Sequence, residues 1–145
     1  MNEFIEMYKQ QTIIKEKIKK NEFPFISEDH KQKFTEYCLK AHVHSEDRER
    51  KAMFFILSGN NDLIAKGIDK FYDFTDNMVK FNPDPEELEK DFEKFNFCSS
   101  SHALTKLALN LYNSGYPSLL VNDTFNQLDK NNYLLAIEAI KIRFE

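Results

Sequence analysis

The feature that most constrains the fold is a run of six consecutive apolar residues, Ala52–Leu57, inside the stretch Ser45–Phe74. Such a run is compatible with a buried strand or with a buried helix. The residues before it favour a helix, because Ser45 can cap a helix start and acidic side chains follow it at the positive end of the helix dipole. We predict an enclosed helical segment at the centre of the core, which Gly59 ends in the left-handed conformation.

Charge pairing supports the same helix start. Glu46 precedes Arg50 by four residues and Asp47 precedes Lys51 by four residues, with the acid on the N-terminal side in both pairs. Side chains at this spacing are neighbours on a helix surface, and each such pair stabilises a helix by about 0.2–0.5 kcal/mol. We therefore expect Arg50 to pair with Glu46, and Lys51 with Asp47.

A second helix is expected to return against the first, so that the stretch forms a helical hairpin. Asp62 is its predicted cap, and Gly67 lies on its apolar face. A glycine inside a helix costs about 1 kcal/mol relative to alanine, which indicates that another helix passes close to Gly67 and that Gly67→Leu destabilises the fold. The apolar face of this second helix comprises Ile64, Ile68, Phe71 and Tyr72.

Further helices are predicted on both sides of the hairpin. The segments Ser27–Asp29 and Asp84–Pro85 are strong helix starts, a triple serine at 99–101 precedes another helix, and Asp129 caps the last one. The positions that helical spacing predicts to be buried are Phe34, Tyr37, Cys38, Ala41, Leu88, Phe92, Phe95, Leu104, Leu107, Ala108, Leu111, Tyr112, Tyr133, Ile137, Ile140 and Phe144.

The composition agrees with a helical domain. A chain of 145 residues fits one domain, and three glycines and four prolines leave little material for the turns of a barrel. Fourteen phenylalanines and six tyrosines, without tryptophan, must fill the core with rings or line a surface groove. We predict an all-α fold, a single compact bundle-like domain over residues 1–145 with six to seven helices and a central helical hairpin.

The segment 1–22 is a special case within this domain. It is polar, and its sparse apolar residues indicate a helix with a narrow apolar stripe. Such a helix can pack on the body, or it can project and pair with a partner protein or with a second copy of the chain as a homodimer. The predicted interaction residues of this stripe are Phe4, Ile5, Tyr8, Ile14 and Ile18.

Charge and cysteine content limit the functional classes. The net charge is −4, and residues 52–97 carry 5 basic and 10 acidic side chains, which opposes general nucleic-acid binding. Two cysteines are too few for a disulfide framework. No signal-peptide pattern opens the chain, and no apolar run approaches the roughly 18–20 residues that span a bilayer. We predict a cytoplasmic protein with free thiols and no membrane partner.

Two cysteine–histidine pairs share one spacing. Cys38 and His42, like Cys98 and His102, stand four residues apart, which places each pair on one face of a helix. If the two pairs met in space, they would supply a Cys2His2 zinc site, for which His44 could replace one ligand. The alternative interpretation is that each residue is an ordinary core or surface side chain that binds no metal. We predict no cofactor, with zinc as the alternative.

Three segments of the chain, DRERKAMFFILSG, SSSHALTKLALNLYN and LLAIEAIKIRF, resemble a family of small uncharacterised proteins. The members occur in low-GC Gram-positive bacteria and in their phages and mobile elements. The resemblance spans Phe25–Phe144 and leaves out the first helix. Because the family is labelled only as a domain of unknown function, the resemblance implies a bacterial or phage accessory protein and assigns no residue roles.

The functional prediction follows from what the sequence contains and lacks. It has no G-x-S-x-G elbow, no H-E-x-x-H, no Walker loop and no C-x-x-C. Its many aromatic residues can supply interface anchors. We predict a non-catalytic interaction or accessory module that acts on an unidentified protein partner. The alternative is an enzyme or a small-ligand or metal-binding protein with a site between helices near His42, His44, Cys98 and His102.

Overall fold

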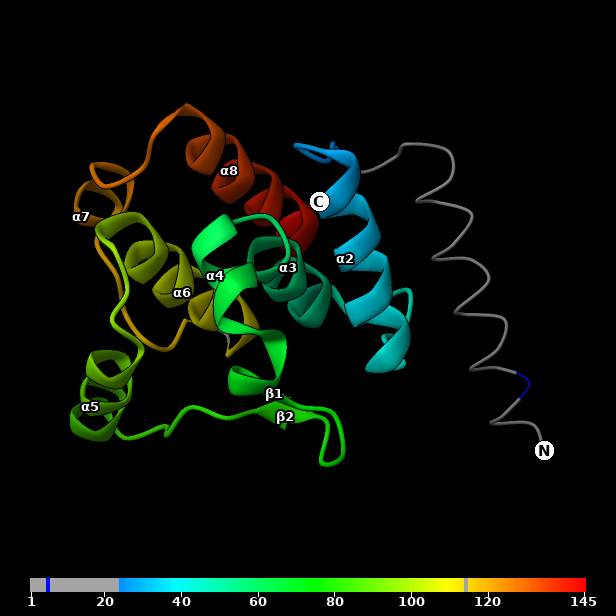
Figure 1. Cartoon of the computed structure of the whole chain (residues 1–145), viewed down its shortest axis with the longest axis horizontal. Coiled ribbons are helices and arrows are strands. Elements are labelled where there is room, and N and C mark those ends of the chain that lie inside the picture. Colours follow the sequence, from blue (N-terminus) through cyan, green and yellow to red (C-terminus); the bar gives the residue numbers. More distant parts are fainter. Residues whose placement is uncertain (1–4, 6–23, 114) are drawn as a thin grey trace.

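The structure is a computed structural model that describes residues 5, 24–113 and 115–145. In these ranges the chain forms seven α-helices, one 3₁₀ turn and one small β-hairpin (Figure 1), so the all-α prediction is confirmed. The elements are α2 (Glu28–Lys40), α3 (Arg48–Leu57), α4 (Asn61–Lys66), η1 (Ile68–Lys70), β1 (Tyr72–Asp73), β2 (Met78–Val79), α5 (Pro85–Phe95), α6 (Ser99–Tyr112), α7 (Val121–Phe125) and α8 (Lys130–Phe144).

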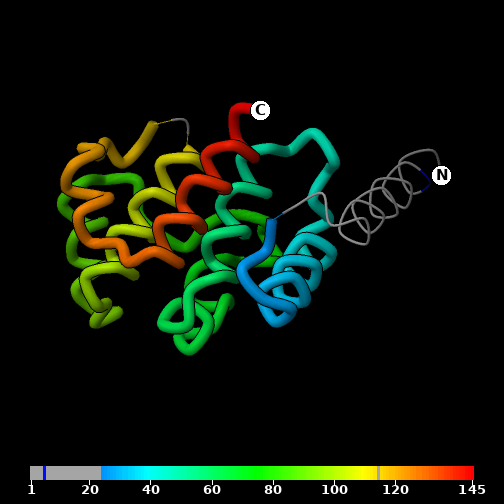
Figure 2. Tube along the Cα trace, turned by 90° about the horizontal axis from the view of Figure 1, so that it is seen from above, coloured from blue at the N-terminus to red at the C-terminus, as the bar shows by residue number. Residues whose placement is uncertain are grey.

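Helix α3 is the centre of the molecule. Its apolar run Ala52–Leu57 is buried on every face, with no residue more than 4% exposed, which confirms the predicted enclosed helical segment. Helices α6 and α8 make its main contacts and α2 packs on it as well (Figures 1 and 2). Full burial of one large apolar side chain stabilises a fold by about 1.5–3 kcal/mol. Because α3 buries several such side chains, it contributes a large part of the stability of the core although it has only ten residues.

Gly59 follows α3 for a different reason from the predicted one. The positive-φ glycines in the described residues are Gly67 and Gly115, so Gly59 does not end the helix in the left-handed conformation. A Cβ atom at Gly59 would lie 3.0 Å from His30 Nε2 and closer still to the side chain of Leu135. The glycine is needed because α8 passes directly against the end of α3.

The second arm of the predicted hairpin is shorter than expected. Helix α4 ends at Lys66, and Asn60 caps it in place of Asp62 by accepting a hydrogen bond from the Leu63 amide. Gly67 has φ +90°, and a Cβ atom built on it meets nothing within 4 Å, so the predicted helix contact at Gly67 is wrong. Phe71 and Tyr72 fit the apolar spacing of a continuing helix. They are buried, but they follow η1 and lie in β1 and do not belong to α4.

Three of the other helix starts follow the sequence prediction, whereas the triple serine 99–101 forms the first turn of α6 and does not precede it. Ser27, Asp84 and Asp129 each cap a helix by accepting backbone hydrogen bonds, at α2, α5 and α8 respectively. Such a cap contributes about 0.5–2 kcal/mol relative to alanine. These starts are local features, so the residues next to each cap suffice to predict them.

The buried face of α8 differs from the predicted one. Tyr133 and Phe144 were expected in the core but are 47% and 66% exposed, whereas Leu135, Ala136 and Ala139 are fully buried. The reason is steric, because two alanines on one face let α8 approach α3 closely. Tyr133, Leu134 and Phe144 are left exposed on its other faces.

Many of the aromatic residues form two groups. One surrounds α3, where Phe54 and Phe55 contact rings from α2 and β1. The other joins α5 to α6, where Phe95 and Phe97 stack at 5.1 Å and Phe92 packs with Leu88 and Leu109. This second group positions the start of α6.

None of the helices in the described residues is both long and apolar enough to span a bilayer.

Candidate functional site

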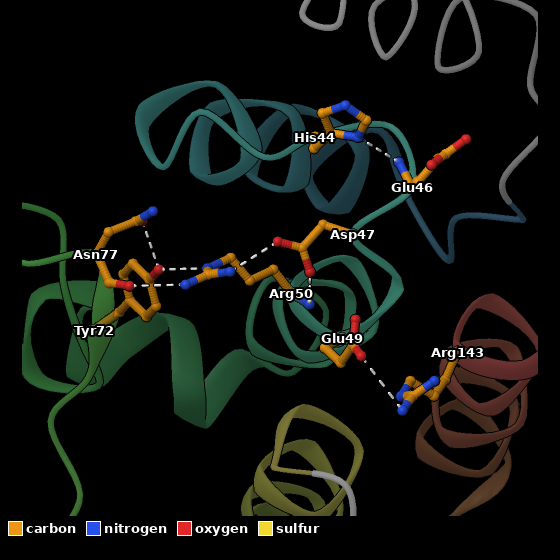
Figure 3. Close-up of polar contacts among 8 residues, drawn as sticks. All are labelled: His44, Glu46, Asp47, Glu49, Arg50, Tyr72, Asn77 and Arg143. Atoms are coloured by element: carbon orange, nitrogen blue, oxygen red, sulfur yellow. Dashed lines mark hydrogen bonds and ion pairs between the residues drawn. The ribbon is translucent and has the colours of Figure 1, made fainter. Parts of the chain in front are cut away.

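A polar network surrounds Arg50 at the start of α3 (Figure 3). The guanidinium donates from Nη1 to Asp47 Oδ2 at 2.8 Å, from Nε to the Tyr72 hydroxyl at 2.9 Å and from Nη2 to the Asn77 carbonyl at 2.9 Å. The Tyr72 hydroxyl in turn donates to Asn77 Oδ1 at 2.6 Å. The predicted pairing of Arg50 with Glu46 is therefore replaced by a pairing with Asp47, which also caps α3.

This network is a structural clamp. It fixes the β1–β2 hairpin to α3, and each nitrogen of the Arg50 guanidinium already has a protein partner. On the other side of α3, Glu49 faces Arg143 of α8 at 3.5 Å.

The same view shows His44, whose Nδ1 accepts a hydrogen bond from the Glu46 amide (Figure 3). His44 is thus an exposed side chain that stabilises the turn before α3.

The residues of the predicted zinc site lie in two separate places. Cys38 belongs to α2 and is fully buried, which raises the pKa of its thiol. His42 is exposed just after α2, with φ 53°. Cys98 and His102 lie at the start of α6. Within the described part of the chain, no group of three or more histidine, cysteine, aspartate or glutamate side chains is placed to hold a metal ion. Zinc binding stays a prediction without an assembled cluster.

Cys98 and His102 do share one site. Both line a cavity of about 420 Å³ between α5 and α6, together with residues such as Glu89 and Phe97. Cys98 is the residue before the first turn of α6, and its Sγ lies 3.4 Å from the Ser100 hydroxyl and 3.2 Å from that of Ser101. The contact with Ser100 is the main reason that the pKa of the Cys98 thiol is lowered.

His102 also lines a second cavity, of about 550 Å³, between α6 and α7. We call it the α6–α7 cavity. Its walls combine apolar and polar groups, and both signs of charge are present. The lining residues are Ser99, His102, Ala103, Lys106, Ser118, Leu119, Leu120, Asp123, Thr124 and Gln127.

The imidazole of His102 is held by two aromatic rings. Its centroid lies 5.2 Å from that of Phe92 in an edge-on arrangement and 6.3 Å from that of Phe97. Burial, followed by the nearby Lys106 ammonium, lowers the pKa of His102, so the ring is neutral at neutral pH. A neutral imidazole can both donate and accept hydrogen bonds. In the part of the chain that is described, no hydrogen bond joins it to a cysteine or serine, so the nucleophile–base contact typical of covalent catalysis is not formed.

A group of exposed apolar side chains lies beside the α6–α7 cavity. We call it the α7–α8 surface and define it as Leu120, Val121, Tyr133 and Leu134, which are 69%, 71%, 47% and 42% exposed. Phe125 connects the two helices, since its ring centroid lies 5.9 Å from that of Tyr133. Leu120 also lines the cavity, which makes the surface and the cavity continuous. Helix α7 and the start of α8 lie at the end of the molecule away from α2 (Figures 1 and 2).

Sequence reasoning singled out only His102 in this region. Helical spacing predicts that Tyr133 is buried, and no motif marks Leu120 or Val121. One signal could have revealed the surface. The alanines at 136 and 139 define the face of α8 that can approach another helix closely, and that face does not include Tyr133.

Residues 20–145 match a family described as a family of unknown function, DUF6075. The chain belongs to this family. The match includes every element from α2 to α8, and hence both cavities and the α7–α8 surface. Neither the curated proteins nor the solved structures contain a match to the chain. Membership in DUF6075 therefore confirms the prediction of a family of unknown function, and it brings no residue roles with it.

The stripe predicted in the segment 1–22 lies almost wholly before the DUF6075 match. Of its residues, the structure describes Ile5, which is helical and 47% exposed. Phe4, Tyr8, Ile14 and Ile18 lie outside the described residues. The interaction assigned to this stripe stays a prediction.

Proposed function

We propose that the protein is a non-catalytic module that binds a partner protein through the α7–α8 surface. The observation that carries this proposal is the exposure of four large apolar side chains at the start of α7 and near the start of α8, two helices that the contact between the Phe125 and Tyr133 rings joins. Scattered exposed apolar residues are ordinary, but a contiguous group bordered by polar residues is typical of an interaction site. Tyr133 has the chemistry of an interface anchor, because tyrosine is enriched among the residues that dominate binding energy.

The adjoining α6–α7 cavity suits a specific partner. An apolar side chain of the partner could enter beside Leu119 and Leu120, while Lys106 and Asp123 offer charges of both signs for polar contacts. Lys106 already pairs with Glu89 at 3.2 Å. This arrangement of apolar contacts with polar groups around them is common in protein–protein interfaces. The modest negative net charge of −4 does not favour nucleic acid as the partner.

The family resemblance supports a cellular setting for this module. We place it in the cytoplasm of a bacterium, as an accessory or regulatory factor encoded by the host or by a mobile element. There it would act by occupying its partner. A second copy of the chain is the other candidate partner, either through the α7–α8 surface or through the predicted stripe at residues 4–18.

Affinity capture from the native host with mass spectrometry tests the proposal. The wild-type chain should enrich a protein that Val121→Asp fails to enrich, because a charge would be buried in the interface. Phe144→Asp is the matched control, since Phe144 is 66% exposed at the far end of α8. Equal enrichment by Val121→Asp and by wild type would contradict the proposal. Sedimentation of the same three proteins reports self-association.

One observation favours a second function, the binding of a small ligand between α5 and α6. Cys98 and His102 line the same cavity of about 420 Å³, within the size range of ligand sites. If a small molecule occupies this cavity in the host, it should slow the alkylation of Cys98 by iodoacetamide. The test adds the small-molecule filtrate of a host lysate to the purified protein and measures the rate at which iodoacetamide alkylates Cys98. An unchanged rate would argue against this function. Buried Cys38 should stay unlabelled in the native protein and serves as an internal control.

A further inference from the structure

The two cavities that His102 lines adjoin each other, because Ser99 borders both of them as well. Helix α6 lies between α5 and α7 (Figure 1), so that one cavity is on the α7 side of α6 and the other is on the α5 side. Ser99, His102 and Lys106 share one face of α6, since they follow one another at helical spacing. We call the two cavities together the His102 groove.

The His102 groove is open to solvent. More than half of its lining residues in the described part of the chain are exposed, among them Ser99, Leu120 and Asn96. A small molecule is usually held in a pocket that encloses most of its surface. An open groove between helices is instead a form in which proteins bind a segment of another protein.

The charged side chains of the groove are mainly acidic. Three carboxylates line it, from Glu89, Glu93 and Asp123, and among its described lining residues Lys106 is the one lysine or arginine. Lys106 pairs with Glu89 at 3.2 Å. The side chains of Glu93 and Asp123 are exposed, and within the residues that the structure describes neither has an ion-pair or hydrogen-bond partner. Two carboxylates of the groove are therefore free to pair with a cationic partner.

Apolar contacts are available on both sides of α6. Leu119 and Leu120 line the groove on the α7 side, and Phe92 and Phe97 line it on the α5 side. Leu120 also belongs to the α7–α8 surface, so a partner that covers this surface reaches the groove directly. The complement of such a groove combines apolar side chains with positive charge.

We propose that the His102 groove binds a basic amphipathic segment of the partner protein. Lysine or arginine side chains of the segment pair with Glu93 and Asp123, and its apolar side chains pack against Leu119 and Leu120. This inference rests on the proposed function, because it names the part of the partner that enters beside the α7–α8 surface. It gives the cavity between α5 and α6 a use that competes with the binding of a small ligand.

The test uses two synthetic peptides with a fluorescent label, whose binding to the full chain is followed by fluorescence anisotropy. One is a short helical peptide of leucine, alanine and lysine, and the other has glutamate in place of every lysine. The lysine peptide should bind about 10-fold or more tightly than the glutamate peptide, because only the former complements the acidic groove. On ¹⁵N-labelled protein it should shift the amide signals of residues 89–106 and 118–127.

Two double variants locate the binding. Glu93→Lys with Asp123→Lys should weaken the binding of the lysine peptide by about 10-fold or more, since both attractions become repulsions. Glu36→Lys with Asp76→Lys is the matched control, because it changes the net charge equally at exposed positions outside the groove. The control should bind within about 2-fold of wild type, since salt screens distant charges.

The proposal is overturned if the lysine peptide does not bind, if it binds no more tightly than the glutamate peptide, or if the control weakens binding as much as the groove variant does. The same variants separate this inference from the proposed function in the capture experiment. If Val121→Asp loses the host partner and Glu93→Lys with Asp123→Lys keeps it, the proposed function stands and this inference fails. If Val121→Asp keeps the partner, the proposed function fails at the α7–α8 surface.

Discussion

Helices α3 and α8 are both rich in apolar residues, yet they have different surroundings. Ala52–Leu57 of α3 is enclosed on every face, whereas α8 buries Leu135, Ala136 and Ala139 and leaves Tyr133 and other large side chains exposed. The difference is in the neighbours, because α3 has helices on several sides and α8 packs mainly against α3 and α6. Apolar sequence alone therefore does not report burial, and the uncovered face of α8 is the part that remains available to a partner.

The largest expected effect comes from truncating a side chain inside α3. Phe54→Ala should lower the free energy of unfolding by about 3–5 kcal/mol, because it leaves a cavity in a fully buried site. Urea denaturation followed by circular dichroism measures this change. If Phe54→Ala cost no more than a typical surface substitution, α3 would not be the centre of the core.

Acid should destabilise the enclosed region through His30. Its Nε2 donates to the Phe55 carbonyl at 2.8 Å and its Nδ1 accepts from the Ile26 amide at 3.2 Å, which requires a neutral ring. Burial lowers the pKa of His30 from 6.5 to about 4. The folded state therefore binds fewer protons than the unfolded state, and stability falls as pH falls from 6.5 to 4, by about 3 kcal/mol in total.

The measurement is urea denaturation at several pH values across this window. His102→Gln is the control, since the pKa of half-buried His102 is lowered as well and contributes a loss of the same sign. The larger part of the pH dependence should survive in His102→Gln and disappear in His30→Gln. A pH profile that is flat between 6.5 and 4 in the wild type would contradict the buried neutral state of His30.

A smaller effect is expected at the contact between α3 and α8. Gly59→Ala should destabilise the protein by about 1–3 kcal/mol, because the new methyl group overlaps Leu135. Combining Gly59→Ala with Leu135→Ala should cost less than the sum of the two single changes, since the second removes the overlapping atoms. Strict additivity in this double-mutant cycle would show that the two residues do not touch.

The smallest effect is expected on the α7–α8 surface. Val121→Ala should change the free energy of unfolding by no more than about 0.5 kcal/mol, as is usual for exposed positions. The same denaturation assay measures it, with Phe54→Ala as the reference. A loss of several kcal/mol would mean that the α7–α8 surface belongs to the core, and the proposed function would lose its support.

The parts of the fold that depend on neighbouring residues could be predicted from the sequence. The caps Ser27, Asp84 and Asp129 act within one helical turn, and the run Ala52–Leu57 is apolar enough to require enclosure. The role of Gly67 could not be predicted, because the apolar spacing is the same whether a helix continues or a 3₁₀ turn follows.

The candidate sites depend on contacts between distant segments. Arg50 reaches Tyr72 and Asn77, which are 22 and 27 residues away, and no local pattern indicates this. The α6–α7 cavity forms because the chain returns along α6 after Pro117, so His102 could be singled out but its surroundings could not.

The enclosure of α3 has a consequence for biosynthesis. Ribosomes deliver the chain from its N-terminus, so Ala52–Leu57 emerges well before α6 and α8, the helices that cover most of it. Until about residue 139 has been synthesised, this apolar segment stays exposed in the nascent chain, where chaperones and proteases can recognise it. A nonsense mutation upstream of α8 should therefore yield an insoluble or rapidly degraded fragment, not a shortened but working protein.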